Sequence, residues 1–324
     1  RCKDCGKTFS STYGTAYYRL QCSRSSFDEA AEMSVNGVGK SAISRIKRRS
    51  WNTIDRWLQQ AFLFAQQFNS LVLKGFEINE LQADEIRTFV GGKKKVRWVF
   101  TALEVSSRLW VGLVVGSRTY KNVKRCLFDV LQRGCVYSRF LFTTDGFDMY
   151  RWLVDRYLAG ACVYGQVIKK RKKNRVTTIR RTLLCGTREQ LEDALLNSED
   201  SSTLNTSFVE RHNLTIRQGS SILCRRTACH AREGRTLEEH LELLRLHYNF
   251  IRPHSALRFG AEVRTPAMQA GLVSRKLYFR DVFMMRLFFF LCVLAVILVS
   301  IRVFIFRGVD LGSNRLLVFR PNNT

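Results

Sequence analysis

The sequence predicts an α/β fold built around a sheet, and three observations lead to this prediction. Apolar runs with the two-residue period of strands alternate with segments of helical period, in the order strand, strand, strand, helix, strand, helix, strand, helix. Hydrophobic residues make up 46% of the 324 residues, which is enough for a packed core. Three acidic residues, Asp84, Asp145 and Glu210, fall far apart on three different elements of this order.

The boundaries of the elements follow from these periods and from the turn residues between them. Strands are expected over residues 81–90, 96–105, 109–115, 140–142 and 163–168, and the polar turn Ser106-Ser107-Arg108 joins the second to the third. Helices are expected over residues 120–132 and 149–158, and a cationic run follows the last strand over residues 169–175. This order is that of the ribonuclease H-like fold, so residues 79–222 are interpreted as a ribonuclease H-like core.

The three acidic residues occupy positions suited to a metal site. Asp84 belongs to the first strand, Asp145 follows the fourth strand just before Gly146, and Glu210 lies in a helical segment. Carboxylate oxygens are the ligands that Mg²⁺ or Mn²⁺ prefers, and two such ions about 3.5 to 4 Å apart promote in-line phosphodiester cleavage. We therefore expect Asp84, Asp145 and Glu210 to be catalytic metal ligands. Three other acids are candidate substitutes for one of these ligands: Asp148, Glu85 and Glu104. Asp148 is favoured among them because it lies one helical turn beyond Asp145.

The helix around Glu210 presents a polar face. Glu210, Asn213 and Arg217 are spaced at i, i+3 and i+7 and therefore share one side of the helix. We expect Asn213 and Arg217 to contact a DNA strand beside the metal. The alternative is a solvated polar face without a function. His212 lies off this face and is expected to be structural.

Residues 25–66 predict a helix-turn-helix domain. Ser50 is the expected N-cap of its third helix, in which Trp51, Ile54, Trp57 and Leu58 recur at helical spacing as a buried stripe. A recognition helix also needs a polar face and nearby cations. The expected DNA contacts are Lys47, Arg48, Arg49, Asn52, Thr53 and Arg56. An ordinary helical domain is the alternative.

The first 24 residues predict a partial zinc ribbon. Cys2 and Cys5, followed by Gly-Lys-Thr-Phe, form a pattern typical of one half of such a ribbon. A tetrahedral Zn²⁺ site needs four ligands, so Zn²⁺ binding is expected only with a complete ribbon, whose other half should precede residue 1. A broken site with free thiols is the favoured interpretation.

The charge of the chain indicates a polyanionic partner. Its 53 Lys and Arg residues outnumber 27 Asp and Glu residues, which leaves a formal net charge of +26. The cations are spread through globular segments, which favours nucleic acid over an anionic membrane surface. Ten scattered cysteines and the lack of an apolar signal segment at the start favour a reducing, cytoplasmic setting, associated with the nucleoid.

Several motifs together resemble DDE transposases of the insertion-sequence-one type found in bacteria and archaea. Residues 33–39 with 51–54 resemble the helix-turn-helix of that family. Its three catalytic segments are resembled by Asp84-Glu85 with residues 89–91, by residues 144–146 with Tyr150, and by Glu210 to Gln218. The likeness covers roughly residues 1–275. The resemblance implies that Asp84, Asp145 and Glu210 form the metal-binding triad and that terminal inverted repeats in double-stranded DNA are the substrate. A homodimer in a synaptic complex is expected, because two DNA ends must be joined.

The C-terminal part divides into two segments. Residues 223–280 are interpreted as a helical extension that covers the core; residues 248–257 resemble the tail of integrase-like transposases, and Thr265-Pro266 marks a final turn. Residues 281–324 form a hydrophobic tail whose uncharged run, residues 287–301, is short for a bilayer core of about 30 Å. Readthrough sequence is favoured over a membrane anchor.

Three functions remain open on the sequence. An active DNA transposase explains the triad and the DNA-binding module together. A catalytically inactive relic that binds the element's ends explains the incomplete ribbon and the unusual tail. A structure-directed nuclease of the same fold ranks last, because it explains the triad but not the presence of a helix-turn-helix.

Overall fold

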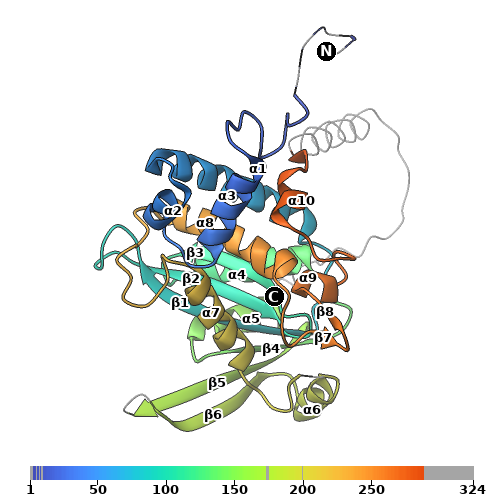
Figure 1. The fold of residues 1–324 in the computed structure, drawn as a ribbon. Helices are drawn as coiled ribbons and strands as arrows, with labels where there is room; N and C mark the ends of the chain where they lie inside the picture. Colours follow the sequence, from blue (N-terminus) through green and yellow to red (C-terminus); the bar gives the residue numbers. More distant parts are fainter. Residues whose placement is uncertain are drawn as a thin grey trace, which may run out of the picture.

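The computed structural model describes residues 3–4, 6, 8, 10–172, 175–198 and 200–287. Within them the chain is a mixed α/β fold around a six-stranded sheet, as the sequence predicts (Figure 1). The strands of this sheet are β1 (Glu80–Phe89), β2 (Val96–Glu104), β3 (Leu109–Gly116), β4 (Phe140–Thr144), β5 (Cys162–Lys172) and β6 (Arg175–Cys185). A separate small hairpin pairs β7 (Arg258–Phe259) with β8 (Glu262–Val263).

The strands follow the spatial order β3-β2-β1-β4-β5-β6. The first three strands form an antiparallel meander, β4 runs parallel to β1, β5 runs parallel to β4, and β6 returns antiparallel to β5. The last residue of β4, Thr144, pairs with Ala83 of β1. Asp84 follows Ala83 on β1, and Asp145 follows Thr144 just past the end of β4. The two aspartates therefore lie beside each other at the same edge of the sheet.

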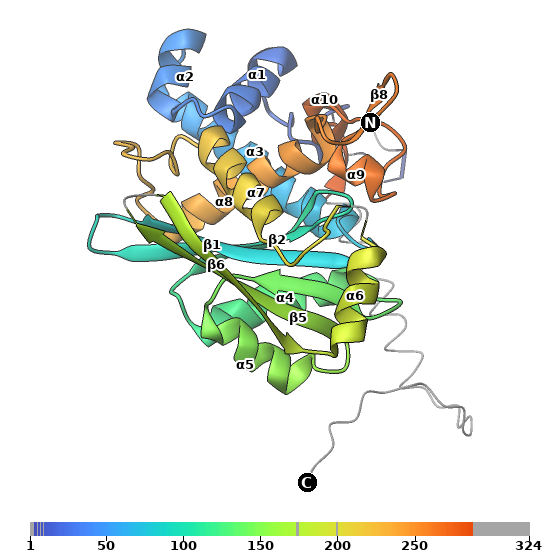
Figure 2. The same cartoon turned by 90° about the horizontal axis from the view of Figure 1, so that it is seen from below.

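Helices cover both faces of the sheet, as Figure 2 shows. The helices α4 and α5 pack on one face, whereas α7 and α8 pack on the other, with α1, α2 and α3 beyond them. The helices are α1 (Arg24–Val35), α2 (Lys40–Lys47), α3 (Trp51–Val72), α4 (Tyr120–Arg133), α5 (Asp148–Tyr157), α6 (Arg188–Leu196), α7 (Ser207–Gly219), α8 (Gly234–Leu246), the π-helix η1 (His247–Ile251), α9 (Pro266–Gln269) and α10 (Phe279–Phe283).

The contact between α3 and α8 joins the N-terminal helices to the sheet layers. Asn69 of α3 is fully buried and donates from Nδ2 to the backbone oxygen of Glu242 at 2.9 Å and to its Oε2 at 2.7 Å. Arg245 donates to both carboxylate oxygens of Glu242 at 2.7 and 2.8 Å. Phe68 of α3 packs edge-to-face on Phe250 at 5.0 Å between ring centroids. One continuous apolar core therefore runs from α1 to α10.

Two expectations for the third N-terminal helix are confirmed and one is wrong. Ser50 is the N-cap of α3 and accepts from the backbone N–H of Thr53, and Ile54, Trp57 and Leu58 are buried. Trp51, expected in the same buried stripe, is 48% exposed. It is the first residue of the helix and lies beyond the packed part, with the ammonium of Lys40 at 5.8 Å from its ring. The helix also runs past residue 66, the expected end of the domain, to Val72.

The segment after β5 differs most from expectation. Of the cationic run, residues 169–172 belong to β5 and Arg175 begins β6, and neither β6 nor α6 was predicted. The residues of β6 up to Arg181 are exposed, so this strand lacks the apolar alternation that marks a half-buried strand. The last helical turns before Arg252-Pro253 and the short helix capped by Thr265 agree with the sequence prediction.

Two predictions lie largely outside the described residues. The zinc-ribbon cysteines Cys2 and Cys5 are not among these residues, and neither is the uncharged run beyond Leu287. In the part of the chain that the structure describes, no helix has the length and apolar character needed to cross a bilayer.

Candidate metal-binding site

The three predicted ligands converge on one cavity. Asp84 of β1, Asp145 after β4 and Glu210 of α7 line a cavity of about 470 Å³. The other two residues of the predicted helix face, Asn213 and Arg217, line the same cavity. The sheet order causes this convergence, because β1 and β4 are neighbours and α7 packs across β1 and β2.

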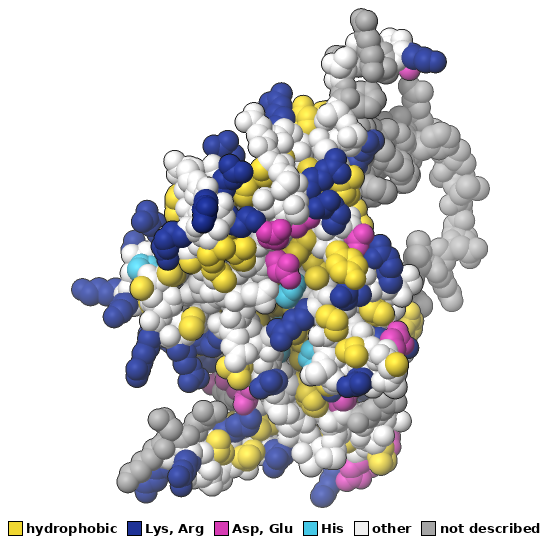
Figure 3. Space-filling model, in the orientation of Figure 1, with side chains coloured by type: hydrophobic (Ala, Val, Ile, Leu, Met, Phe, Trp, Pro, Cys, Tyr) yellow, Lys and Arg dark blue, Asp and Glu magenta, His cyan; other side chains and the backbone are white. Residues whose placement is uncertain are grey.

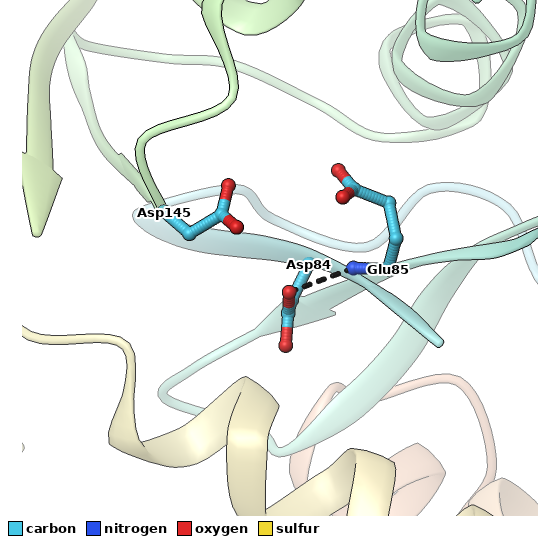
Figure 4. Close-up of side chains that lie close together, drawn as sticks. All are labelled: Asp84, Glu85 and Asp145. Atoms are coloured by element: carbon cyan, nitrogen blue, oxygen red, sulfur yellow. Dashed lines mark hydrogen bonds between the residues drawn. The ribbon is translucent and has the colours of Figure 1, made fainter. Parts of the chain in front are cut away.

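Within the cavity, the tightest acidic group consists of Asp84, Glu85 and Asp145. One carboxylate oxygen from each lies within 4.8 Å of the others, and this is the arrangement that could hold a metal ion. Figure 4 shows the carboxylates of Glu85 and Asp145 on one side of β1 and that of Asp84 on the other. Asp145 lies beyond the end of β4, next to β1. From there its carboxylate is close both to Glu85 on one side of β1 and to Asp84 on the other. Glu210 lines the cavity but does not belong to this group.

The electrostatics of the group favour a bound cation. Burial, followed by the charge of Asp145, raises the pKa of Asp84 to about 6. The same two causes raise the pKa of Glu85 to about 7, although Arg118 opposes the shift. Burial also raises the pKa of Asp145. A divalent cation would offset this mutual repulsion, and hard oxygen ligands suit Mg²⁺ or Mn²⁺.

Glu85 has a further feature that fits a ligand. Its side chain is 1% exposed, and its Oε2 accepts from Arg118 at 2.9 Å. Its other oxygen, Oε1, is buried and makes no hydrogen bond of normal geometry among the described residues, although the buried hydroxyl of Tyr150 lies near enough to this carboxyl to oppose the rise of its pKa. Arg118 is fixed in turn by the ring of Phe147, whose centroid lies 3.8 Å from the guanidinium carbon. The position of this oxygen in the acidic group makes Glu85 a candidate ligand alongside Asp84 and Asp145.

Asp84 is held from two sides. Its Oδ1 accepts from the backbone N–H of Glu85 at 2.8 Å, and its Oδ2 accepts from Nδ2 of Asn213 at 2.9 Å. Asn213 is itself fixed, because its Oδ1 accepts from Thr101 of β2 at 2.8 Å. Both ends of the Asn213 amide are thus engaged within the protein.

The carboxylate of Glu210 is paired with a lysine and a threonine. Its Oε1 lies 2.5 Å from Nζ of Lys169 on β5 and accepts from Oγ1 of Thr206 at 2.8 Å. Thr206 is the residue that precedes α7, and Lys169 lies on the strand beside the cavity. In this arrangement the cation beside Glu210 is the Lys169 ammonium.

Two arginines, Arg217 and Arg225, bring positive charge to the lining of the cavity. Arg217 donates to the backbone oxygen of Leu223 at 3.2 Å and to that of Arg87 at 3.4 Å. Burial and the neighbouring Arg225 lower the pKa of Arg217. Arg225 is exposed and lines the cavity too. The cavity that holds the acidic residues is therefore also lined by two guanidiniums.

The other sequence candidates lie elsewhere. Glu104 is buried at the end of β2, where it accepts from the N–H groups of Ser106 and Ser107 and so closes the β2–β3 turn. Asp148, the favoured substitute, is exposed at the start of α5 and belongs to no metal-compatible group among the described residues. His212 is buried between Trp110 and Tyr248, and burial lowers its pKa to about 3, as expected for a structural residue.

The predicted DNA contacts of the N-terminal helices cluster around the start of α3. Asn52 and Arg56 are exposed on its first turns, and Arg49 is exposed just before them. Arg48, also exposed, ends α2 in the left-handed conformation, whereas Lys47 is paired with Glu29 at 2.5 Å. Thr53 is half-buried, with its hydroxyl 2.8 Å from that of Ser50.

Sequence reasoning ranked Glu85 below Asp148 and missed Lys169. Asp148 was favoured because it lies one helical turn beyond Asp145, whereas adjacent residues on a strand point to opposite faces and give no local reason to group Glu85 with Asp84. Lys169 was one of several cations in the run that follows the fifth expected strand. In the sequence, the signal for Glu85 was its place next to Asp84. The signal for Lys169 was its place directly after an expected strand. No protein-family model matches the chain, and no curated protein matches it.

Proposed function

We propose that this protein is a DDE transposase of the insertion-sequence-one type, with a ribonuclease H-like core and an N-terminal helix-turn-helix. The observation that carries the proposal is the convergence of Asp84, Asp145 and Glu210 on one cavity from β1, the end of β4 and α7. The strand order with a parallel β1–β4 pair beside an antiparallel meander supports the same core.

Asp84, Asp145 and Glu85 or Glu210 would hold Mg²⁺ or Mn²⁺. The bound ions would activate an attacking oxygen and stabilise a leaving one. In cleavage, a water oxygen bonds to phosphorus while the P–O3′ bond breaks, which leaves a 3′ hydroxyl and a 5′ phosphate. In strand transfer, that 3′ hydroxyl bonds to a target phosphorus and displaces the target's own 3′ oxygen. No protein side chain becomes covalently attached.

The protein's own residues would orient these groups. Asn213 holds the carboxylate of Asp84 through a hydrogen bond of 2.9 Å. Arg217 and Arg225, which line the cavity, suit the phosphates on either side of the reacting one. Arg49, Asn52 and Arg56 at the start of α3 suit the recognition of an inverted repeat, because a helix that presents polar side chains from its first turns is suited to the major groove. A homodimer would bring two DNA ends together.

A relic that binds element ends without cutting them is the second candidate. It is favoured by the ion pair between Lys169 and Glu210, which places the third carboxylate against a lysine instead of beside Asp84 and Asp145. In this alternative the cavity would bind a metal ion weakly and DNA cleavage would be absent.

The DNA that flanks the gene supplies the test. Matching inverted repeats would be synthesised as labelled duplexes and incubated with the protein in Mg²⁺, in Mn²⁺ and in EDTA. A transposase would cut at the repeat ends and join them to target DNA only with a divalent ion. A relic would bind the repeats in all three conditions and cut in none. Absence of both binding and cutting would overturn both candidates.

A further inference from the structure

The β5–β6 hairpin leaves the sheet as a two-stranded ribbon. Pairing of β4 with β5 ends at Gln166, whereas β5 and β6 stay paired from Val167 and Arg181 out to Lys172 and Arg175. About six residues of each strand thus extend alone, which at roughly 3.3 Å per residue gives an arm of about 20 Å. Figure 1 shows this arm at the bottom of the molecule, projecting past the other strands.

The arm is strongly cationic. The whole hairpin, residues 162–185, contains no Asp or Glu. Lys170, Lys172, Arg175 and Arg180 are exposed, and none of them has an ion-pair partner among the described residues. Unpaired exposed cations that repel one another along a ribbon imply an anionic partner.

The root of the arm is part of the cavity. Val167, Ile168 and Lys169 line it, and Lys169 is the residue that pairs with Glu210. In Figure 3 the arm at the lower left is separated from the body by a hollow, with Asp and Glu side chains in the hollow and Lys and Arg side chains on both sides. A partner that follows the arm therefore enters the cavity.

We propose that the β5–β6 ribbon is an arm that lies along duplex DNA and holds it by its phosphates beside the metal-binding cavity. The major groove of B-DNA, about 12 Å wide, admits a two-stranded ribbon, and about 20 Å of ribbon spans roughly six phosphates of one strand. The inference rests on the proposed function, because it assigns the DNA of that reaction to a surface. Ile168, Val176 and Ile179 are each at least 40% exposed among the cations, so an anionic lipid surface is the competing partner that the test must exclude.

The test measures binding without cleavage. Fluorescence anisotropy of a labelled duplex of about 30 base pairs, in EDTA and over roughly 50 to 300 mM salt, would compare three full-length proteins. The arm variant carries Lys170→Thr, Lys172→Thr, Arg175→Thr and Arg180→Thr, which keeps strand propensity. The matched control loses four exposed cations without a salt bridge among the described residues, on the loop after α3, on α4, on the loop before β4 and on α5: Lys74→Thr, Lys121→Thr, Arg139→Thr and Arg156→Thr.

The arm variant should bind at least about tenfold more weakly than the control at roughly 100 mM salt. Its slope of log K against log salt should be shallower by about one for each phosphate that it no longer neutralises, whereas the control should stay near the unsubstituted protein. Equal affinities and slopes for arm variant and control would overturn the arm. The arm would also be overturned if the variant stopped binding vesicles that contain anionic lipid while it still bound DNA.

A second measurement does not depend on the fourfold variant folding. A photo-crosslinking amino acid at Thr178, an exposed position of β6, should crosslink to the duplex, whereas the same residue at Tyr157 on α5 should not. Crosslinking at neither position while the protein binds DNA would overturn the arm alone. Failure of the unsubstituted protein to bind any duplex would instead overturn the proposed function.

Discussion

Asn213 of α7 donates from Nδ2 to Oδ2 of Asp84 on β1 at 2.9 Å and accepts from Thr101 through its other end. The amide is therefore engaged with the proposed catalytic carboxylate, although the sequence suggested a DNA contact for it. The two roles predict different variant behaviour.

Replacing Asn213 with Ala should weaken Mg²⁺ binding. The substitution removes a donor to the charged form of Asp84, and loss of such a partner of a metal ligand typically costs about tenfold to a hundredfold in metal affinity. Calorimetry with Mn²⁺ and Mg²⁺ would measure this loss, and metal-free DNA binding should change by less than about twofold. The opposite pattern, intact metal affinity with weakened DNA binding, would show that the amide contacts DNA.

Replacing Lys169 with Met should strengthen metal binding. The ammonium of Lys169, 2.5 Å from Glu210, competes with a metal ion for that carboxylate. An ion pair worth about 1 kcal/mol corresponds to roughly fivefold in apparent affinity. Lys170→Met is the control, because Lys170 is exposed and unpaired in the described structure. Unchanged affinity for Lys169→Met would mean that Glu210 does not join the metal site.

The effect of Mg²⁺ on stability should grow with pH. Folding raises the pKa of Asp84 to about 6 and that of Glu85 to about 7, above the values near about 4 of an unfolded chain. The folded state therefore binds more protons than the unfolded state between about pH 4 and 7, and without metal its stability should fall as pH rises through this window. Above it both carboxylates are charged and available to a cation. The rise in Tm caused by about 10 mM Mg²⁺ should be larger at about pH 8 than at about pH 5; a rise independent of pH would rule out these carboxylates as ligands.

Replacing Asn69 with Ala should destabilise the protein by about 2 kcal/mol, because it removes two buried hydrogen bonds to Glu242 and leaves Arg245 as the remaining donor to that buried carboxylate. Urea unfolding would measure the loss. Gln66→Ala on the exposed side of the same helix is the control and should cost less than about 0.5 kcal/mol. Equal losses for the two variants would show that the buried contact contributes little.

Much of the fold could be predicted because its strands have clear periods. The strand that carries Asp84 lies within one residue of the expected range 81–90, and the strand that precedes Asp145 begins at Phe140 as expected and ends two residues later, because the apolar residues 140–142 mark its start. The arm could not be predicted, because β6 is exposed along most of its length and no burial pattern marks it as a strand. The exposure of Trp51 depends on how far the helices packed against α3 extend along it. The spacing of residues within α3 does not reveal this.

The candidate site was predictable in part for a similar reason. Helical spacing alone grouped Glu210, Asn213 and Arg217, because it depends only on the helix itself. The contribution of Glu85 depends on β4 ending opposite Ala83, which lets Asp145 reach past the strand edge. That register is a tertiary property, so the sequence favoured Asp148 instead.

The most direct test of the account compares Asp145→Asn with Asp148→Asn in Mg²⁺-dependent cleavage and strand transfer on inverted-repeat DNA. The two carboxylates are three residues apart, but only Asp145 belongs to the acidic group with Asp84 and Glu85 among the described residues. Asp145→Asn should abolish both reactions while binding of the repeat ends stays within about twofold, and Asp148→Asn should retain both. Full activity of Asp145→Asn would contradict the central claim.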